Sequence, residues 1–399
     1  MTTDAKDLVD GTGLRSIAML TDPVGVLSVY TTADPREGST MRPAWQVRIA
    51  NEFAALDRRL RKDDDTSLAD LLAVRLADVD RELRALVDAA TAGQGRALFL
   101  ALDAGTITTV AVQVPLGDHV ELGRSAYVRP LLAALSAYPP AGVVAVSGHG
   151  VHLVDVRLGH AVDAGSDSYE PVDTGRRDLT GPAAANPAAA QHSAAQHDLY
   201  ARREADRLAR FLRGAGGWVA GRAVELGWEY LVVTGDPERT AAFVAGLPHD
   251  RALPTVTVGH RVAGLPAAKV YPLIAAELAD LRHRCARDVA RRARDLALGG
   301  GAGAYGLADT LTALAEGAVL NLVLDASAEW AGRVGPDGRL YPELVAVPGV
   351  ADEALAVEPR LGERMVEAAL RQGGRVTLLD PADAVDLRDA GGVAAVLRW

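Results

Sequence analysis

Cysteine is almost missing from this chain of 399 residues, in which Cys285 is the only one. A single cysteine excludes a framework of disulfides and a zinc site built from several cysteines. Long apolar runs are missing too, since none reaches the roughly 18 residues that a membrane span requires. The first seven residues carry two acids and one lysine, and they lack the apolar core of a signal peptide. We therefore expect a soluble, cytoplasmic protein with no membrane partner.

Lysine is scarce as well. Lys6, Lys62 and Lys269 are the only lysines among 42 basic residues, and the formal net charge is −10. An acidic balance argues against a protein that simply coats nucleic acid. Hydrophobic residues make up 49% and charged residues 24% of the chain, which is enough for ordinary hydrophobic cores. At roughly 100–200 residues per domain, the length predicts two to four domains.

Strand and helix patterns alternate along the chain. Alternating or continuous short apolar runs predict strands, and apolar residues spaced by three and four predict helices. Strands are expected at residues 26–30, 96–102, 108–114, 142–146, 151–156, 228–233, 318–324, 376–379 and 392–397. Helices are expected at about 45–60, 68–86, 270–298 and 362–372. This order predicts an α/β protein in which helices pack on sheets.

One stretch, residues 175–196, is poor in large apolar side chains and contains Pro182 and Pro187. Such a composition buries little surface, which predicts an exposed, mobile loop followed by a helix from Asp198. The loop carries two glutamines, Gln191 and Gln196, each followed by a histidine. It is flanked by seven arginines, namely Arg176, Arg177, Arg202, Arg203, Arg207, Arg210 and Arg213.

These arginines outnumber the four acids between residues 176 and 213, so this region is basic in an acidic chain. Arginines gathered in this way can bind phosphate groups. The same residues can also form a solvated helix face with ion pairs such as Asp206–Arg210. The residues alone leave both interpretations open.

Other candidate sites have weaker patterns. The glycine-rich residues 299–306 lack the lysine of a phosphate loop and follow a helix, so a connector is favoured over the nucleotide site of a small-molecule enzyme. His149 and His152 lie three apart on a strand pattern and face opposite sides, which makes a poor metal pair. Asp155 and Asp163 are expected on a solvated sheet face. We predict no metal and no cofactor.

Cys285 lies among arginines, which would lower the pKa of an exposed thiol. No histidine or acid is placed beside it by the sequence, so a catalytic cysteine is not predicted. Ser147 does not lie in the Gly-x-Ser-x-Gly pattern of a hydrolase.

Several motifs in a fixed order resemble one known superfamily. Residues 304–319 followed by 322–325, and the terminal residues 390–399, resemble the third domain of archaeal and eukaryotic class I release factors and Pelota. Residues 127–132, 142–146 and 154–159 look like its bacterial branch, which includes the Vms-type peptidyl-tRNA hydrolases and the Pelota-like hibernation factors. The resemblance covers residues 127–399.

The resemblance implies three α/β domains, at residues 1–138, 139–266 and 267–399. The middle domain, with the mobile loop 175–196, would be ribonuclease-H-like. The last would resemble the ribosomal kink-turn-binding fold. The implied partners are the ribosome, through rRNA and peptidyl-tRNA, and a translational GTPase through the C-terminal domain. Arg176, Arg177, Arg202, Arg203 and Arg207 would then be RNA-binding residues.

Hydrolytic members of the superfamily carry Gly-Gly-Gln, or a looser Gly…Gln, on the middle-domain loop. Here Gln191 and Gln196 each follow two alanines, which cannot readily take the positive φ angles that glycine allows. The resemblance therefore implies a factor that binds the ribosomal A site in rescue or hibernation without strong catalysis. The alternative is a peptidyl-tRNA hydrolase in which Gln191 or Gln196 is catalytic, so it stays open whether the protein is an enzyme.

Overall fold

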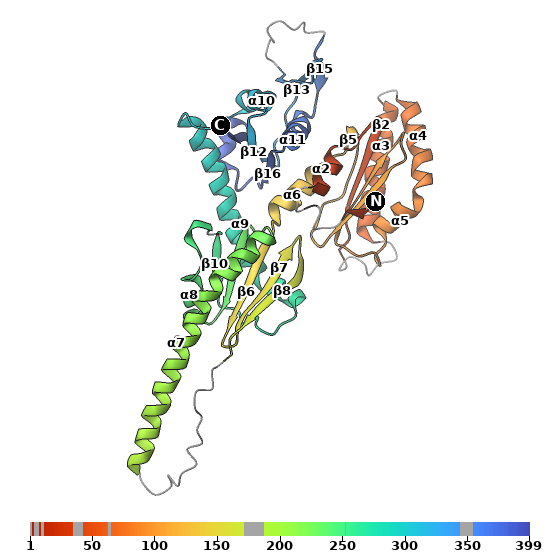
Figure 1. Cartoon of the computed structure of the whole chain (residues 1–399). Helices are drawn as coiled ribbons and strands as arrows, with labels where there is room; N and C mark the ends of the chain where they lie inside the picture. The colour runs from red at the N-terminus through yellow and green to blue at the C-terminus, as the bar shows by residue number, and fades with distance from the viewer. Residues whose placement is uncertain are drawn as a thin grey trace. The chain divides into compact units, whose positions relative to one another are not determined.

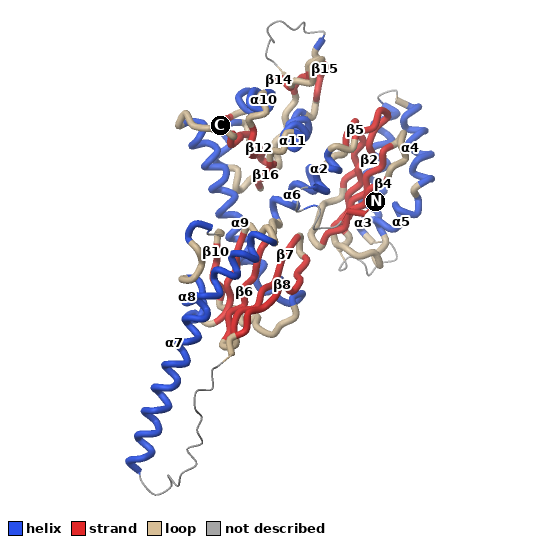
Figure 2. The backbone as a smooth tube through the Cα atoms, viewed as in Figure 1, coloured by secondary structure: helices blue, strands red, loops and turns tan. Residues whose placement is uncertain are grey.

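The computed structural model describes residues 2–3, 8, 12–34, 43–62, 65–170, 187–251, 253–343 and 354–399. The chain divides into two compact units. Unit 1 comprises Met1–Pro139, Arg157–Gly159 and Arg282–Trp399, and unit 2 comprises Pro140–Val156 and His160–Leu281. Figure 2 shows sheets and helices in both units, which confirms the α/β class. The three-domain boundaries stay a prediction.

The N-terminal part of unit 1 is a five-stranded sheet covered by helices. Its strands run in the order β1 (Thr2–Thr3), β4 (Ile107–Val112), β3 (Gly95–Ala101), β2 (Thr21–Thr32) and β5 (His119–Ser125). Helices α3 (Ala44–Lys62), α4 (Thr66–Asp78) and α5 (Asp80–Val87) bury their apolar stripe against Leu27, Leu98 and Leu100 of this sheet. The predicted helix around 45–60 and the strands at 96–102 and 108–114 are confirmed.

The C-terminal part of unit 1 has two sheets. The larger runs β11 (Gly303–Tyr305), β17 (Val393–Leu397), β12 (Val319–Asp325), β16 (Arg375–Leu379). The smaller runs β14 (Leu340–Pro342), β13 (Gly332–Val334), β15 (Ala356–Glu358). The helical elements here are α10 (Leu307–Ala315), α11 (Leu361–Arg371) and the short η5 (Val385–Ala390).

One hydrophobic core joins these two parts. It contains Tyr30 and Phe99 from the N-terminal sheet, Leu131 from α6 (Arg129–Ala137), and Leu322 and Val366 from the C-terminal part. Helix α2 (Thr12–Ala18) contributes to the same core. Helix α6 packs along the edge strand β16, where the Ser136 hydroxyl accepts a hydrogen bond from the Leu378 N–H at 3.0 Å.

Unit 2 is built on one mixed sheet. The strand order is β10 (Thr255–Val258), β9 (Tyr230–Gly235), β6 (Ala141–Ser147), β7 (Gly150–Arg157), β8 (His160–Ser168). Strand β6 runs antiparallel to β7 and parallel to β9, and β9 runs parallel to β10. In chain order the arrangement is 3-2-1-4-5, which is that of a ribonuclease-H-like sheet, as the resemblance implies for this region.

Helices cover both faces of this sheet. Helices α7 (Pro187–Glu225) and α8 (Pro237–Val244) pack on the face formed by Val144, Leu153 and Val233. The first part of α9 (Ala267–Leu298) packs on the opposite face. A short turn of 3-10 helix, η3 (His249–Arg251), follows α8. Where α7 and α8 meet, Gly216 is required, because a Cβ there would lie 2.2 Å from the Gly246 carbonyl oxygen.

A buried hydrogen bond between an indole ring and a carboxylate stabilises this sheet. Asp155 on β7 is buried and accepts a hydrogen bond from the Trp228 indole N–H at 2.7 Å, so its expected place on a solvated face was wrong. The reason is that β7 lies between two neighbouring strands with helices on both faces. The Trp228 ring covers Gly142 on β6, where an added Cβ would lie 2.2 Å from the ring.

We predict that Gly142→Ala destabilises the protein by about 3 kcal/mol, because the methyl group displaces Trp228 and breaks its buried hydrogen bond. The measurement is urea unfolding followed by tryptophan fluorescence. Gly217→Ala is the matched control, since a Cβ at Gly217 meets nothing within 4 Å. An equal loss in both variants would contradict this account of Gly142.

Candidate functional site

The longest helix of the structure, α7, has 39 residues from Pro187 to Glu225. At 1.5 Å per residue it is about 58 Å long. Its C-terminal part is held by buried Leu212, Ala215 and Val219. Among residues 201–225, whose side chains the structure describes, Leu208 is the first that packs on the core. Figure 1 shows the N-terminal part of α7 extending beyond the strands of unit 2. We call residues 187–207 of α7 the arm.

The arm corrects the prediction of a loop over residues 175–196. Residues 187–196 are helical, so α7 begins at Pro187 and not at Asp198. Five of these ten residues are alanines, the best helix former, and proline is favoured at the first position of a helix. Residues 175–186, with Arg176 and Arg177, lie outside the described residues.

Gln191 and Gln196 both lie on the arm. They are five residues apart, so their positions differ by about 140° around the helix axis. Both lie beyond the first four helical residues, and their backbone N–H groups therefore donate to carbonyl groups inside the helix. Unlike the N–H groups of a glycine-rich loop, they are not available to a ligand.

The predicted arginines share one side of α7. Arg202, Arg203, Arg207, Arg210 and Arg213 fall within an arc of about 140°, opposite the residues that pack on the sheet. We call these five residues the arginine face. All five side chains are exposed or half-exposed, and only two acids, Glu204 and Asp206, lie in the same stretch.

The arginine face is only partly neutralised by its own chain. Arg207 Nη1 lies 3.8 Å from Glu204 Oε2. The Arg210 Nε–H donates to the Asp206 carbonyl oxygen at 3.3 Å, not to the carboxylate. Within the described part of the chain, Arg202, Arg203 and Arg213 form no ion pair. Three guanidinium groups of the arginine face therefore have no carboxylate partner among the described residues.

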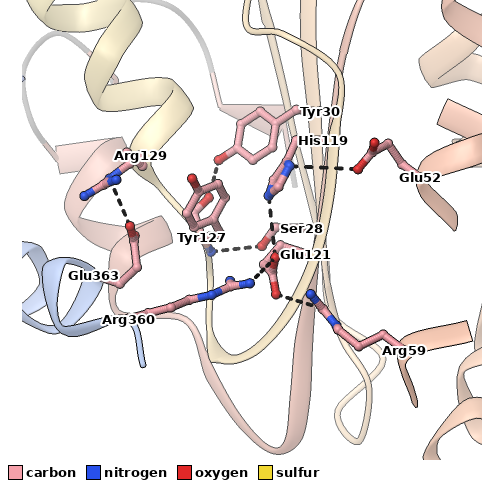
Figure 3. A network of polar contacts seen from close by, with 10 residues as sticks. All are labelled: Ser28, Tyr30, Glu52, Arg59, His119, Glu121, Tyr127, Arg129, Arg360 and Glu363. Carbon is pink, nitrogen blue, oxygen red and sulfur yellow. Dashed lines mark hydrogen bonds and ion pairs between the residues drawn. The ribbon is translucent and has the colours of Figure 1, made fainter. Parts of the chain in front are cut away.

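Unit 1 contains a second polar cluster, drawn in Figure 3. Its centre is the buried Glu121 on β5, which lies 3.1 Å from Arg59 Nη2 and 2.7 Å from Arg360 Nη2. His119 Nε2 lies 3.5 Å from the same carboxylate. Burial raises the pKa of Glu121, but the hydrogen bonds and charges of His119, Arg360 and Arg59 outweigh it and lower the pKa to about 2.

The pKa of a second carboxylate in this cluster is raised instead of lowered. Glu363 on α11 pairs with Arg129 at 3.1 Å, and the two side chains are only 17% and 14% exposed. Burial raises the pKa of Glu363 to about 7, although Arg129 and Arg360 act to lower it. Beside it, burial and the Glu363 charge raise the pKa of Tyr127 to about 12. The Tyr30 hydroxyl donates to the Tyr127 carbonyl oxygen.

This cluster joins the N-terminal sheet to α11. Glu121 and Glu363 each pair with at least one arginine. Sequence reasoning missed it because its residues are spread from position 28 to position 363 and form no motif. The only local signal was that Tyr127 and Arg129 belong to the family-like stretch 127–132.

The weaker candidates do not assemble into sites. No group of three histidine, cysteine, aspartate or glutamate side chains suited to a metal ion occurs among the described residues. His152 pairs with Asp163 at 2.5 Å, whereas His149 lies in the turn before β7. Burial raises the pKa of the half-buried Cys285 thiol, with Asp288 adding to it, so the thiol is not activated. Within the same described ranges, no helix has the length and apolar character needed to cross a bilayer.

The glycine-rich segment has a packing explanation. Gly303–Tyr305 is strand β11, paired with β17, so the expected connector is partly a strand. A Cβ at Gly303 would lie 2.5 Å from the Ala297 nitrogen at the end of α9. Close backbone approach within the chain therefore accounts for this glycine.

Part of the chain is similar to a known protein family. Residues 127–279 match the family model described as bacterial archaeo-eukaryotic release factor family 10. The match covers every strand of unit 2 and the whole of α7. This segment belongs to the bacterial branch of the archaeo-eukaryotic release factors. The resemblance inferred from the motifs is thus confirmed.

Several solved structures of translation termination factors and Pelota proteins have low similarity to this chain. Archaeal translation termination factor aRF1 shares 15% identity, with 100% of this chain and 99% of that chain covered and a TM-score of 0.23. Dom34 from S. cerevisiae, described as a translation termination-like factor interacting with Hbs1, shares 10% identity over 76% and 79% of the two chains, with a TM-score of 0.38. Archaeal Pelota, in a model of its ribosome-bound complex with ABCE1, shares 14% identity over 100% and 95%, with a TM-score of 0.36.

These TM-scores are below 0.5, so the family assignment depends on residues 127–279. No curated protein matches the chain. The release-factor segment contains the arm, the arginine face and both glutamines.

Proposed function

We propose that the protein is a ribosome-associated translation factor that occupies the A site in rescue or hibernation, without strong catalysis. The observation that carries this proposal is the arginine face of a release-factor segment. Its long helix presents five arginines away from the core. A factor of this kind acts in the cytoplasm.

The charges support RNA as the ligand of the arm. Phosphate groups are the dominant contact of proteins with nucleic acids, and arginine binds them through paired N–H groups. The whole chain is acidic at −10, so the arginine face is a local exception and not part of a general positive charge. Arg176 and Arg177 would extend the same contact.

The backbone of the arm argues against efficient hydrolysis. Hydrolysis of the peptidyl-tRNA ester requires a water placed against the ester carbonyl, and positioned donors supply most of the help. In the arm, the N–H groups of Gln191 and Gln196 are used within the helix, and alanines precede both. Binding without release is therefore the favoured function.

The C-terminal part is proposed to contact a protein. From Asp325 to the end, 13 residues are acidic and eight are basic. This excess of negative charge suits a basic protein surface better than rRNA. A translational GTPase or the ribosomal stalk base is the partner we propose for it.

The second candidate is a peptidyl-tRNA hydrolase, favoured by one observation: both glutamines lie in the release-factor segment. To test it, the protein is incubated with ribosome–nascent-chain complexes and released peptide is measured. We expect no release above buffer. Release that is lost in Gln191→Ala or Gln196→Ala, but kept in the control Gln113→Ala on the other unit, would overturn the non-catalytic account.

A further inference from the structure

One tyrosine, Tyr169, contacts the last turn of the arm. Tyr169 follows β8, and its hydroxyl donates to Glu204 Oε1 on α7 at 2.7 Å. The Tyr169 N–H donates to the His149 carbonyl oxygen at 2.8 Å. Its ring packs against Phe211 with centroids 5.4 Å apart. Tyr169 therefore ties the chain leaving β8 to both the sheet and the helix.

Glu204 connects this tyrosine to the arginine face. Its second oxygen, Oε2, is buried and accepts no hydrogen bond among the described residues. The Arg207 guanidinium lies 3.8 Å from this oxygen. One carboxylate thus binds the tyrosine with one oxygen and holds an arginine of the arm with the other.

The contact between Tyr169 and Glu204 lies where the packed part of α7 meets the arm. Among residues 201–225 of α7, Leu208 is the first that packs on the core, and Glu204 lies one turn before it. A helix without tertiary contacts is only marginally stable in water. The bond to Tyr169 therefore holds the turn at which the packed helix becomes the projecting arm.

We propose that Tyr169 is a positioning residue of the arm: acting through Glu204, it fixes the direction in which Arg202 and Arg203 on the arm meet an RNA backbone. Glu204 in addition places a negative charge 3.8 Å from Arg207, which weakens the attraction of Arg207 for that backbone. The positioning part rests on the fold of unit 2 alone, whereas the RNA part rests on the proposed function.

Two variants separate positioning from charge. Tyr169→Phe keeps the ring against Phe211 and removes only the hydroxyl that reaches Glu204. Glu204→Gln keeps an oxygen for that hydroxyl and removes the charge that holds Arg207. Tyr271→Phe, in the same unit but on α9, is the control for the first variant. Glu225→Gln, whose carboxylate pairs with Arg222 at 2.5 Å at the other end of α7, is the control for the second.

The direction of the arm is measured in the full chain with nitroxide labels. Labels are placed at Ala195→Cys on the arm and Glu238→Cys on α8, in a Cys285→Ala background. Electron paramagnetic resonance then gives the distribution of distances between them. We expect a narrow distribution in the parent protein, Glu204→Gln and Tyr271→Phe, and a broad one in Tyr169→Phe. An unchanged distribution in Tyr169→Phe overturns the positioning role.

Binding to ribosomes is measured with the same variants at several salt concentrations. Tyr169→Phe is expected to weaken binding several-fold with the salt dependence unchanged, since no cation is lost. Glu204→Gln is expected to strengthen binding and to raise the slope of log affinity against log salt, because the variant loses a negative charge beside the arginine face. No change in slope overturns the role of Glu204. If the parent protein binds no ribosomes, the proposed function fails, while the distance measurement still decides the positioning role.

Discussion

Replacing Arg202, Arg203 and Arg213 with glutamine is expected to weaken ribosome binding by on the order of 100-fold near physiological salt. These three side chains form no ion pair among the described residues, so their loss breaks no ion pair in that part of the chain. Each phosphate contact releases about one counterion, so the slope of log affinity against log salt should fall by about three. Filter binding of purified ribosomes over a salt series measures both quantities.

The matched control is a second set of three arginines. Arg284, Arg292 and Arg388 are also exposed and form no ion pair within the described ranges, but they lie in the C-terminal part of unit 1. Their replacement by glutamine changes the net charge equally. If both triple variants lose the same affinity, the arginine face has no special role and binding reflects total charge only.

Replacing Arg129 with methionine is expected to lower the free energy of unfolding by about 3 kcal/mol at about pH 8, because Glu363 is left buried without its main partner. The loss should be smaller at about pH 5.5, where burial keeps Glu363 protonated and neutral. Urea unfolding at the two pH values measures the difference. Adding Glu363→Gln to Arg129→Met should recover part of the loss at the higher pH, and failure to recover it would show that Arg129 acts only through packing.

The Glu363 carboxyl also makes stability depend on pH. Its pKa is raised to about 7 in the folded protein, from an ordinary value of 4.5. A raised pKa contributes stability that is present below the ordinary value and is lost as the pH rises through about 7. Glu121 has the opposite sign: with a pKa lowered to about 2, its contribution is lost as the pH falls below 4.5. Glu363→Gln should flatten only the first of these two changes, and an unchanged profile between about pH 5 and 8 would refute the assignment.

Local patterns predicted the central strands of the three larger sheets, but β5, β8, β10 and helix α6 were not among the expected elements. The apolar runs at 142–146 and 151–156 form the paired strands β6 and β7, and the run at 228–233 overlaps β9. These signals are local because alternation and turn residues lie within a few positions of each other. The family-like motifs then placed the release-factor segment in the chain.

The arm shows where local composition misleads. Few large side chains in residues 187–196 were interpreted as a loop, but alanine needs no core contact to favour a helix. Asp155 shows a second limit, since burial depends on Trp228, more than 70 residues away in the chain. The cluster around Glu121 and Glu363 was beyond sequence reasoning for the same reason: tertiary packing alone brings α11 to β5.

Co-sedimentation of the purified protein with ribosomes at increasing salt tests the central claim most directly. The account predicts that the protein pellets with ribosomes at moderate salt and dissociates steeply as salt rises, because phosphate contacts by the arginine face dominate the binding. A protein that stays in the supernatant at moderate salt would contradict it.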